Sequence, residues 1–566
     1  MSHRNPIAAI VIVVGAVVAS AQTPPSPVPS DAEIRKILAE RIDTHHQAVG
    51  IVVGVVEPAG RRIVSYGAAA KSGGPALDGD TVFEIGSITK VFTSLLLADA
   101  VKRGEVGLED PIAKHLPSTV AVPVRGRAIT LEDLASHRSA LPRLPTNFAP
   151  KDPSNPYADY TVENLYQFLS TQQLTRDVGA SYEYSNLGAG LLGHLLARRT
   201  GMDYEALVKA RITGPLGMPN TVVTLSPALR ARLAAGYDAS LAPTNNWDLP
   251  TLAGAGALRS TANDMLTLLE AFLGYRQNAL APAMAEMVKP RAPAGPNTQI
   301  ALGWHITTGN DKTIVWHNGG TGGYRSFLAF DPAARAGVVV LANAGTIAGP
   351  DDIGRHLLDS RSALLAAGSP ALAQQKQRTA ITISNEVFDR YVGRYQLAPA
   401  AFFTISRDGG KFLAQLTGQP SAEIFAETEK EFFYKIVDAQ LTFETDAQGK
   451  AVALVLHQNG VNQRAPRIEG EAVVPKEITL DAAVLEGYVG RYEIAPGVAF
   501  TITRQENHLF AQLTGQPSVE IFPSAPREFF YKVVNAQLTF EVGADGRATA
   551  VVLHQFGRDM RATRAN

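Results

Sequence analysis

A repeat that spans the last third of the chain constrains its fold more than any other feature. Four motifs recur at one constant offset of 97 residues, and their first residues are Tyr391 and Tyr488 (YVGRY), Gln415 and Gln512 (QLTGQP), Ala439 and Ala536 (AQLTFE), and His457 and His554 (HQ). A period of this length has the size of a domain and is too long for one unit of a solenoid. The sequence therefore predicts two copies of one small domain.

Each copy has the pattern of a small all-β domain. Short alternating runs such as Phe403-Thr-Ile-Ser are separated by turn residues such as Asp408-Gly409-Gly410, which predicts antiparallel strands joined by tight turns. We therefore expect two small antiparallel β-barrels, over residues 384–470 and 481–566. The repeated histidines, His457 and His554, are more simply structural residues that were copied with the domain.

The chain before the repeat has a different pattern. Apolar β-branched runs, from Ile51 to Val56 and from Val338 to Leu341, bracket long helical patterns such as Val91 to Val101 and Leu187 to Arg199. This order predicts a mixed α/β domain over residues 31–368, with strands at both sequence ends and helices between them. The small and polar stretch 368–379 is typical of a linker. A multidomain protein is also expected from the length of 566 residues, which exceeds what one core normally organises.

Composition excludes several classes of function. Because the chain has no cysteine, it has no disulfide, no thiolate metal site and no cysteine nucleophile. The 52 basic residues almost cancel the 53 acidic ones, and no basic run could follow a phosphate backbone, so we expect no nucleic-acid partner. The histidines show no zinc spacing such as His-Glu-x-x-His, so we expect no metal and no cofactor.

The N-terminus has the pattern of a cleavable signal peptide. Arg4 precedes an apolar stretch from Ile7 to Val18, and the small residues Ala19-Ser20-Ala21 follow it. The apolar stretch is shorter than the roughly 20 residues that span a bilayer, which favours cleavage over a membrane anchor. We therefore expect residues 1–21 to be a signal peptide. The protein would be exported, to the periplasm or beyond, with no integral membrane segment after cleavage.

The segment Phe83-Glu-Ile-Gly-Ser-Ile-Thr-Lys90 carries the first catalytic signal. Ser87 and Lys90 are three residues apart at the start of a helical pattern, so their side chains share one helix face. A serine in the first turn also lies beside free backbone NH groups and the positive end of the helix dipole, where an oxyanion is stabilised. Ser-x-x-Lys alone also occurs at ordinary helix starts, so its interpretation depends on what accompanies it.

A second signal, Tyr184-Ser-Asn186, opens the helical pattern that begins at Leu187. A tyrosine near a lysine ammonium can be shifted toward phenolate and act as a general base, and an asparagine amide can hold a substrate carbonyl. The simpler alternative is an aromatic residue packed at a helix start, with Asn186 as a cap.

A third signal, Trp316-His317-Asn-Gly319-Gly320, precedes the strand-like run Phe327-Leu-Ala-Phe. Glycines on an edge strand let a substrate backbone approach closely, and the NH of Gly320 could complete an oxyanion hole with the NH of Ser87. The simpler alternative is a glycine-rich hairpin with a structural histidine.

In this order and at these separations, Ser87-Ile-Thr-Lys90, Tyr184-Ser-Asn186 and His317-Asn-Gly319 resemble the three motifs of one family of serine hydrolases. That family contains class C β-lactamases, low-molecular-weight DD-peptidases, D-aminopeptidases and related esterases. The similarity covers about residues 31 to 365. It implies an antiparallel sheet flanked by helices plus a helical lobe, with the site between them. The two repeats similarly resemble the lipocalin-like C-terminal domains of some members, D-aminopeptidases among them.

The resemblance also implies roles for individual residues. Ser87 would attack the substrate, and Lys90 and Tyr184 would move protons. The substrate-binding residues implied are Asn186, His317, Gly319 and Gly320, with the NH groups of Gly320 and Ser87 binding the oxyanion.

Two positions depart from the family pattern. His317 replaces the lysine of the Lys-Thr-Gly motif of the β-lactamases, a form more frequent in D-aminopeptidases and esterase-like members, and Ala140 stands where glycine is common. A histidine has an ordinary pKa near ~6.5 and is mostly neutral at pH ~7.5. We therefore expect weak binding of carboxylate-bearing β-lactams at neutral pH, which improves as the pH falls toward ~6.

The leading hypothesis is a serine hydrolase that acts through an acyl-enzyme at Ser87 on β-lactams or on peptides that contain D-residues. One alternative is a carboxylesterase that uses the same residues. Another is a binding protein that is acylated with negligible turnover, with its barrels holding a lipophilic ligand.

Overall fold

A computed structural model describes residues 26–295, 297–346, 349–365, 380–399, 401–417, 421–434, 439–458, 461–470, 475–495, 498–514, 518–532, 536–555 and 558–565. The expected signal peptide, residues 1–21, and the expected linker, residues 368–379, lie outside them. Among the described helices, none has the length and apolar character needed to cross a membrane.

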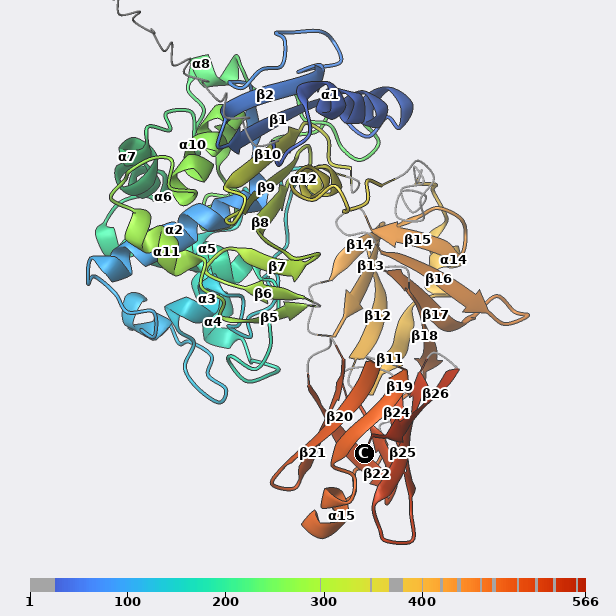
Figure 1. The fold of residues 1–566 in the computed structure, drawn as a ribbon. Helices are drawn as coiled ribbons and strands as arrows, with labels where there is room; N and C mark the ends of the chain where they lie inside the picture. Colours follow the sequence, from blue (N-terminus) through green and yellow to red (C-terminus); the bar gives the residue numbers. More distant parts are fainter. Residues whose placement is uncertain are drawn as a thin grey trace, which may run out of the picture.

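An antiparallel sheet forms the centre of the N-terminal domain, residues 26–365 (Figure 1). Its strands, in their order across the sheet, are β2 (Gly60–Gly67), β1 (Gly50–Glu57), β10 (Ala336–Ala342), β9 (Arg325–Asp331), β8 (Lys312–Gly320), β7 (His305–Gly309), β6 (Thr298–Ile300) and β5 (Ala292–Gly295). Strands from the two ends of the domain's sequence are neighbours, since Val53 of β1 pairs with Val340 of β10. The expected α/β domain with an antiparallel sheet is confirmed.

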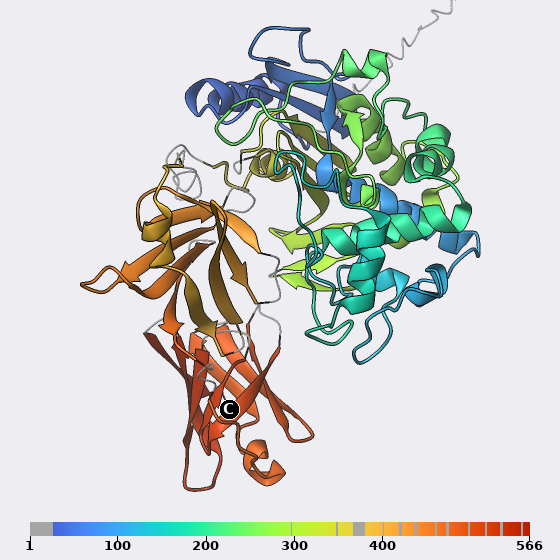
Figure 2. The same ribbon diagram turned by 180° about the vertical axis from the view of Figure 1, so that it is seen from behind.

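Helices cover both faces of this sheet (Figures 1 and 2). Along β1 the side chains alternate between two cores, because successive residues of a strand point to opposite faces. Val53 packs in the core that contains Ile34 and Ile353, whereas Val52 packs in the core that contains Leu95. The apolar run of β1 is therefore buried on both sides.

The first core lies under α1 (Asp31–Ala39) and α12 (Asp351–Leu358), and the second lies under α2 (Thr89–Lys102), α10 (Ala262–Phe272) and α11 (Ala281–Met287). The remaining helices of the domain, several of which form the helical lobe, are α3 (Leu131–Ala135), α4 (Val162–Thr171), α5 (Asn186–Thr200), α6 (Tyr204–Val208), α7 (Gly214–Leu216), α8 (Pro227–Arg230) and α9 (Ala253–Gly256). A small separate sheet pairs β3 (Val82–Glu84) with β4 (Arg259–Thr261). Strand β3 leads directly into the turn that carries Ser87.

Two closed eight-stranded barrels follow the N-terminal domain. The strands of barrel 1 are β11 (Gly393–Ala398), β12 (Ala401–Asp408), β13 (Lys411–Leu416), β14 (Ala422–Ala426), β15 (Glu431–Tyr434), β16 (Gln440–Thr445), β17 (Ala451–Gln458) and β18 (Val461–Ile468). Those of barrel 2 are β19 (Gly490–Ala495), β20 (Val498–Gln505), β21 (His508–Leu513), β22 (Val519–Ala525), β23 (Glu528–Phe530), β24 (Ala536–Val542), β25 (Ala548–Gln555) and β26 (Arg558–Arg564). Each strand pairs with its sequence neighbours and the last pairs with the first, so both barrels have up-and-down topology and confirm the expected β-barrels.

Aromatic and aliphatic side chains pack the described interior of each barrel. In barrel 1, Tyr391 stacks on Phe443 at 4.5 Å, and a short helix, α14 (Asn385–Asp389), adds Phe388, which stacks on Phe412 at 4.0 Å. In barrel 2 the helix α15 (Ala482–Glu486) contributes Leu485 instead. An eight-stranded barrel is just wide enough for side chains to fill it. These cores favour a structural interior over the lipophilic-ligand alternative.

The barrels lie end to end, and barrel 1 is the one beside the N-terminal domain (Figures 1 and 2).

Candidate active site

Ser87 lies in a 3₁₀ turn, Gly86–Ile88, immediately before α2. The turn is held against the end of strand β8, because Gly86 has a φ of +48° and a Cβ there would stand 2.6 Å from the backbone N of Gly320. Only glycine combines that backbone conformation with so close an approach. The hydroxyl of Ser326 donates to the carbonyl of Ile85 at 2.8 Å and fixes the same junction.

Lys90 sits in the first turn of α2 with 1% of its surface exposed. Its Nζ lies 3.0 Å from Ser87 Oγ, and it donates to Asn186 Oδ1 at 2.9 Å and to the carbonyl of Ala255 at 2.6 Å. All three partners are uncharged, so no carboxylate compensates a buried ammonium here. Burial, and secondarily the positive charge of Arg143, hold the pKa of Lys90 well below its ordinary value. The neutral amine that this favours keeps two hydrogens, for Asn186 and Ala255, and presents its lone pair to the Ser87 hydroxyl, so it can accept that proton.

Tyr184 is half-buried next to this pair, with its ring centroid 4.9 Å from Lys90 Nζ. The ring also packs on His137, at 4.4 Å between centroids. Burial raises the pKa of Tyr184 to about 12, and a hydrogen bond with Ser87 offsets part of that effect. The expectation that a lysine ammonium shifts Tyr184 toward phenolate is therefore wrong for the resting site, because burial favours the neutral form of both groups.

Asn186 is the first residue of α5, and Ser185 caps that helix through its hydroxyl, which accepts from the NH of Gly188 at 2.8 Å. Since Asn186 Oδ1 accepts from Lys90, its Nδ2 is the donor group, and it donates to the hydroxyl of Tyr157 at 3.1 Å. The backbone NH of Asn186 donates to the carbonyl of Arg143 at 3.0 Å. The amide is thus held in one orientation beside Lys90.

The end of β8 runs past Ser87. Strand β8 is not an edge strand, contrary to expectation, because β7 and β9 flank it. Its pairing with β7 nevertheless stops at Trp316, so residues 317–320 have one side free of a strand partner. A Cβ on Gly319 would stand 2.1 Å from the carbonyl O of Ile85 and 3.0 Å from the backbone N of Ser87. Glycine there lets the strand backbone lie against the nucleophile's turn.

His317 is fully buried, with 0% exposure, behind this strand end. Its Nδ1 lies 2.6 Å from the carbonyl O of Asn318, and because a carbonyl can only accept, Nδ1 carries the hydrogen. Its Nε2 has no hydrogen-bond partner among the described residues. Burial, and secondarily the neighbouring His305, hold the pKa of His317 well below its ordinary value. The expected protonation near pH 6 is therefore wrong, because His317 has no solvent to stabilise its charge.

The structure thus brings together all seven predicted residues, and it adds four that have no predicted role: His137, Arg143, Tyr157 and Ala255. Nδ1 of His137 accepts from the NH of Ser185 at 3.1 Å and so positions the segment that carries Tyr184. The contacts of His137 and Ala255 join segments far apart in the sequence, so they depend on tertiary structure. Tyr157 lies in a loop without any motif.

Ala140, which replaces a common glycine, adopts a φ of +59°. This is the left-handed region that favours glycine, which explains the family's usual residue.

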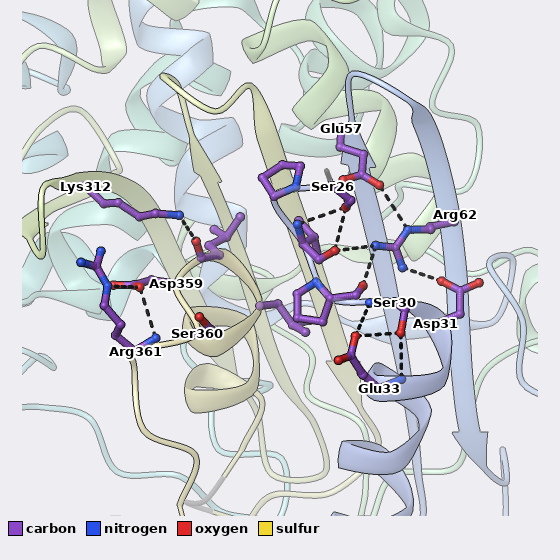
Figure 3. Close-up of a pocket in the computed structure, with 15 residues that line it drawn as sticks. Ser26, Ser30, Asp31, Glu33, Glu57, Arg62, Lys312, Asp359, Ser360 and Arg361 are labelled. Carbon is purple, nitrogen blue, oxygen red and sulfur yellow. Dashed lines mark hydrogen bonds and ion pairs between the residues drawn. The ribbon is translucent and has the colours of Figure 1, made fainter. Parts of the chain in front are cut away.

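A pocket of the N-terminal domain lies away from these residues (Figure 3). It has a volume of about 740 Å³ and is formed by the segment before α1, the β1–β2 turn region and the end of α12. Its charges satisfy one another: Arg62 pairs with Asp31 and Glu57, and Arg361 pairs with Asp359. None of the seven site residues lines it, and we assign it no chemistry. No cluster of potential metal ligands occurs in the described parts of the chain.

Comparison with known proteins agrees with this architecture. The β-lactamase family profile matches residues 34–362, and a domain of unknown function (DUF3471) matches residues 377–469 and again 474–565. The chain is 32% identical over 311 residues to the D-alanyl-D-alanine-carboxypeptidase/endopeptidase AmpH of Escherichia coli K12. The aligned region covers 52% of this chain and 79% of that protein. It is 25% identical over 427 residues to penicillin-binding protein 4* of Bacillus subtilis, covering 71% of this chain and 91% of that one.

Among solved structures, a β-lactamase/D-alanine carboxypeptidase from Yersinia pestis superposes with a TM-score of 0.52 at 27% identity, covering 59% of this chain and 97% of that one. The fold and these relatives define the protein as a serine hydrolase. The chain belongs to the β-lactamase family.

Proposed function

We propose that the protein hydrolyses β-lactams or peptides that contain D-residues through an acyl-enzyme at Ser87. The observation that carries this proposal is the hydrogen bond of 3.0 Å between Lys90 Nζ and Ser87 Oγ, in a site where Lys90 is buried without a carboxylate. The names of the relatives, which include carboxypeptidases, β-lactamases and a penicillin-binding protein, support this substrate class.

The proposed acylation breaks one carbon–nitrogen bond and moves, in net, one proton from Ser87 to the leaving nitrogen. Ser87 Oγ forms a bond to the substrate carbonyl carbon as the neutral amine of Lys90 takes the serine proton. The developing oxyanion would accept from the NH groups of Ser87 and Gly320. When the carbon–nitrogen bond breaks, the leaving nitrogen takes a proton from Tyr184, and Lys90 returns the serine proton to Tyr184. Water then hydrolyses the ester by the reverse route.

Two groups, one on each side of Ser87, would orient the substrate. Asn186, whose Nδ2 is a donor, would hold a carbonyl of the acyl part. The free side of residues 317–320, with Gly319 at its centre, would pair with the substrate backbone.

Mass spectrometry of the intact protein tests this proposal. The protein is incubated with a penicillin, with N-acetyl-D-alanyl-D-alanine and with a short-chain ester, and we expect a mass increase equal to the acyl group, located at Ser87. In the matched control, Ser87→Ala, we expect no labelling and an unchanged melting temperature, since the change removes one hydroxyl. Labelling of that variant at another serine would show that the nucleophile is wrong.

A carboxylesterase is the second candidate, and one observation favours it. Position 317 is a buried neutral histidine, so the strand end offers no fixed positive charge to a substrate carboxylate. In the same experiment an esterase would be labelled by the ester and not by the penicillin or the peptide. A binding protein with negligible turnover would release one equivalent of product in a burst and then stop.

We also propose that the protein is exported, on the sequence pattern of residues 1–21. N-terminal sequencing of the protein from a periplasmic fraction should begin after Ala21, and a retained Met1 would contradict the proposal.

A further inference from the structure

Arg143 is an exposed cation at the edge of the candidate site. Arg143 follows the segment that contains His137, and its guanidinium lies 5.1 Å from the ring centroid of Tyr184. Its side chain is exposed, and among the described residues it has no hydrogen-bond or ion-pair partner. Its charge nevertheless acts on the site, since it contributes to lowering the pKa of Lys90 and of His137. A guanidinium so placed is available to a ligand.

The backbone fixes where this cation stands. The carbonyl of Arg143 accepts from the NH of Asn186 at 3.0 Å and from the NH of Leu187 at 3.2 Å. These bonds hold residue 143 at the start of α5, so only the side chain beyond its Cα is free to move. The guanidinium therefore reaches Tyr184 from the Asn186 side of the site.

The other cationic candidates are less suited to bind an anion. His317 is neutral and buried, and the buried Lys90 Nζ is already taken up by three hydrogen-bond partners. Arg325, near Gly320, donates to the carbonyls of Thr321 and Tyr324, and Asp351 lies close enough to raise its pKa in opposition to burial. Arg143 has no such compensation. A planar guanidinium also binds a carboxylate through two parallel hydrogen bonds.

We propose that Arg143 binds a carboxylate of the substrate, and so supplies the anion recognition that His317 does not. This inference rests on the proposed function, because it concerns the same site. Since Arg143 is tied to the start of α5 beside Asn186, the carboxylate belongs to the acyl part of the substrate, which Asn186 would orient. A carboxylate in the leaving group would instead lie toward His317.

Equilibrium binding to the Ser87→Ala protein tests the inference without requiring turnover. Three peptides are compared by calorimetry: N-succinyl-D-alanyl-D-alanine amide has its carboxylate in the acyl part, N-acetyl-D-alanyl-D-alanine has it in the leaving part, and N-acetyl-D-alanyl-D-alanine amide is neutral. Hydrogen bonds to charged groups contribute enough for a roughly tenfold preference. We expect the succinyl peptide to bind about tenfold more tightly than the neutral peptide, and Arg143→Gln to abolish that difference.

Arg335→Gln is the matched control, because Arg335 is also exposed and also lies over a tyrosine ring, 4.3 Å from Tyr275, at the far end of β9. It should leave all three affinities unchanged. A preference for N-acetyl-D-alanyl-D-alanine that Arg143→Gln abolishes would keep the role of Arg143 but move the carboxylate to the leaving part.

Two outcomes would overturn the inference. One is an equal affinity of the Ser87→Ala protein for charged and neutral peptides. The other is an equal loss for all three peptides in Arg143→Gln, which would mean that Arg143 acts only by positioning Tyr184. The proposed function is tested by a different measurement, the labelling of Ser87 in the wild-type protein. Absence of that label would contradict the proposed function without changing these binding results.

Discussion

The N-terminal domain and the two barrels bury different kinds of side chain. Among the described residues, every buried charged or polar side chain other than tyrosine lies at or before Asp359. The barrels bury aliphatic and aromatic residues, and their two most deeply buried tyrosines are satisfied locally: the hydroxyl of Tyr395 donates to the carbonyl of Tyr391, and that of Tyr492 to the carbonyl of Tyr488. The barrel cores therefore carry little electrostatic cost.

The N-terminal domain accepts such a cost in the candidate site. Lys90, His137 and His317 are all buried, and burial is the main cause of the lowered pKa of each. Buried ionisable groups that lack compensation destabilise a fold and are typical of catalytic sites. In the candidate site three such groups lie together without a carboxylate partner. The repeated His457 and His554 instead bond to strand neighbours, Thr442 and Thr539 among them.

The largest expected effect concerns a barrel core, where the contrast predicts a loss of stability without a loss of chemistry. Phe432→Ala removes a fully buried ring from barrel 1 and should lower its free energy of unfolding by about 3–5 kcal/mol. The repeat offers a matched variant, Phe529→Ala, at the equivalent position of barrel 2. Urea unfolding measures the loss, and penicillin labelling of Ser87 should keep its wild-type rate. A large fall in that rate would contradict the division of roles.

Lys90→Ala should have the opposite effect, because it should lower the acylation rate much more than the stability of the fold. Removal of the amine that accepts the Ser87 proton should lower the acylation rate roughly hundredfold or more. Lys90→Met, which keeps most of the buried stem, separates the loss of the amine from the loss of packing. Stopped-flow acylation measures both variants. If Lys90→Met acylated at the wild-type rate, Lys90 would not be the base.

The sequence carried most of the fold because its signals are local or repeated. The constant offset between Tyr391 and Tyr488 needs no structure to be recognised, and the apolar runs of β1 and β10 fix two central strands. The motifs of the site were likewise visible, since Ser87 and Lys90 meet within one turn of helix.

What the sequence did not supply depends on burial and on chain-distant contacts. No local pattern shows that His317 is enclosed, and so its ordinary pKa was the wrong reference. The place of Arg143 beside the site depends on the bonds of its carbonyl to the start of α5, which are contacts between segments distant in the sequence. Similarly, the glycines at the end of β8 predict an edge strand, because nothing in them encodes the pairing of β7 with the first half of β8.

Truncation tests the independence of the two regions and should have a small effect. A chain that ends at Ala371 retains every described element of the N-terminal domain. We expect it to fold and to be labelled at Ser87 at a rate within about threefold of the full chain, since each region has its own core. Labelling by intact mass and the melting temperature are the measurements. An insoluble or unlabelled product would make the barrels part of the catalytic unit.

The smallest expected effect is the pH dependence of substrate choice, which follows from the buried state of His317. A lowered pKa in the folded protein means that protonation requires a pH below the ordinary value of ~6.5, so between pH ~6 and ~8 the residue stays neutral. The acylation rate with a penicillin, divided by the rate with a neutral ester, should therefore change less than about twofold across this range.

The neutral ester is the necessary control, because Lys90 and Tyr184 act on both substrates and their own titration cancels in the ratio. A ratio that rises severalfold toward pH ~6 would show that His317 becomes cationic in the site. His317 would then not belong with the buried groups that stay neutral.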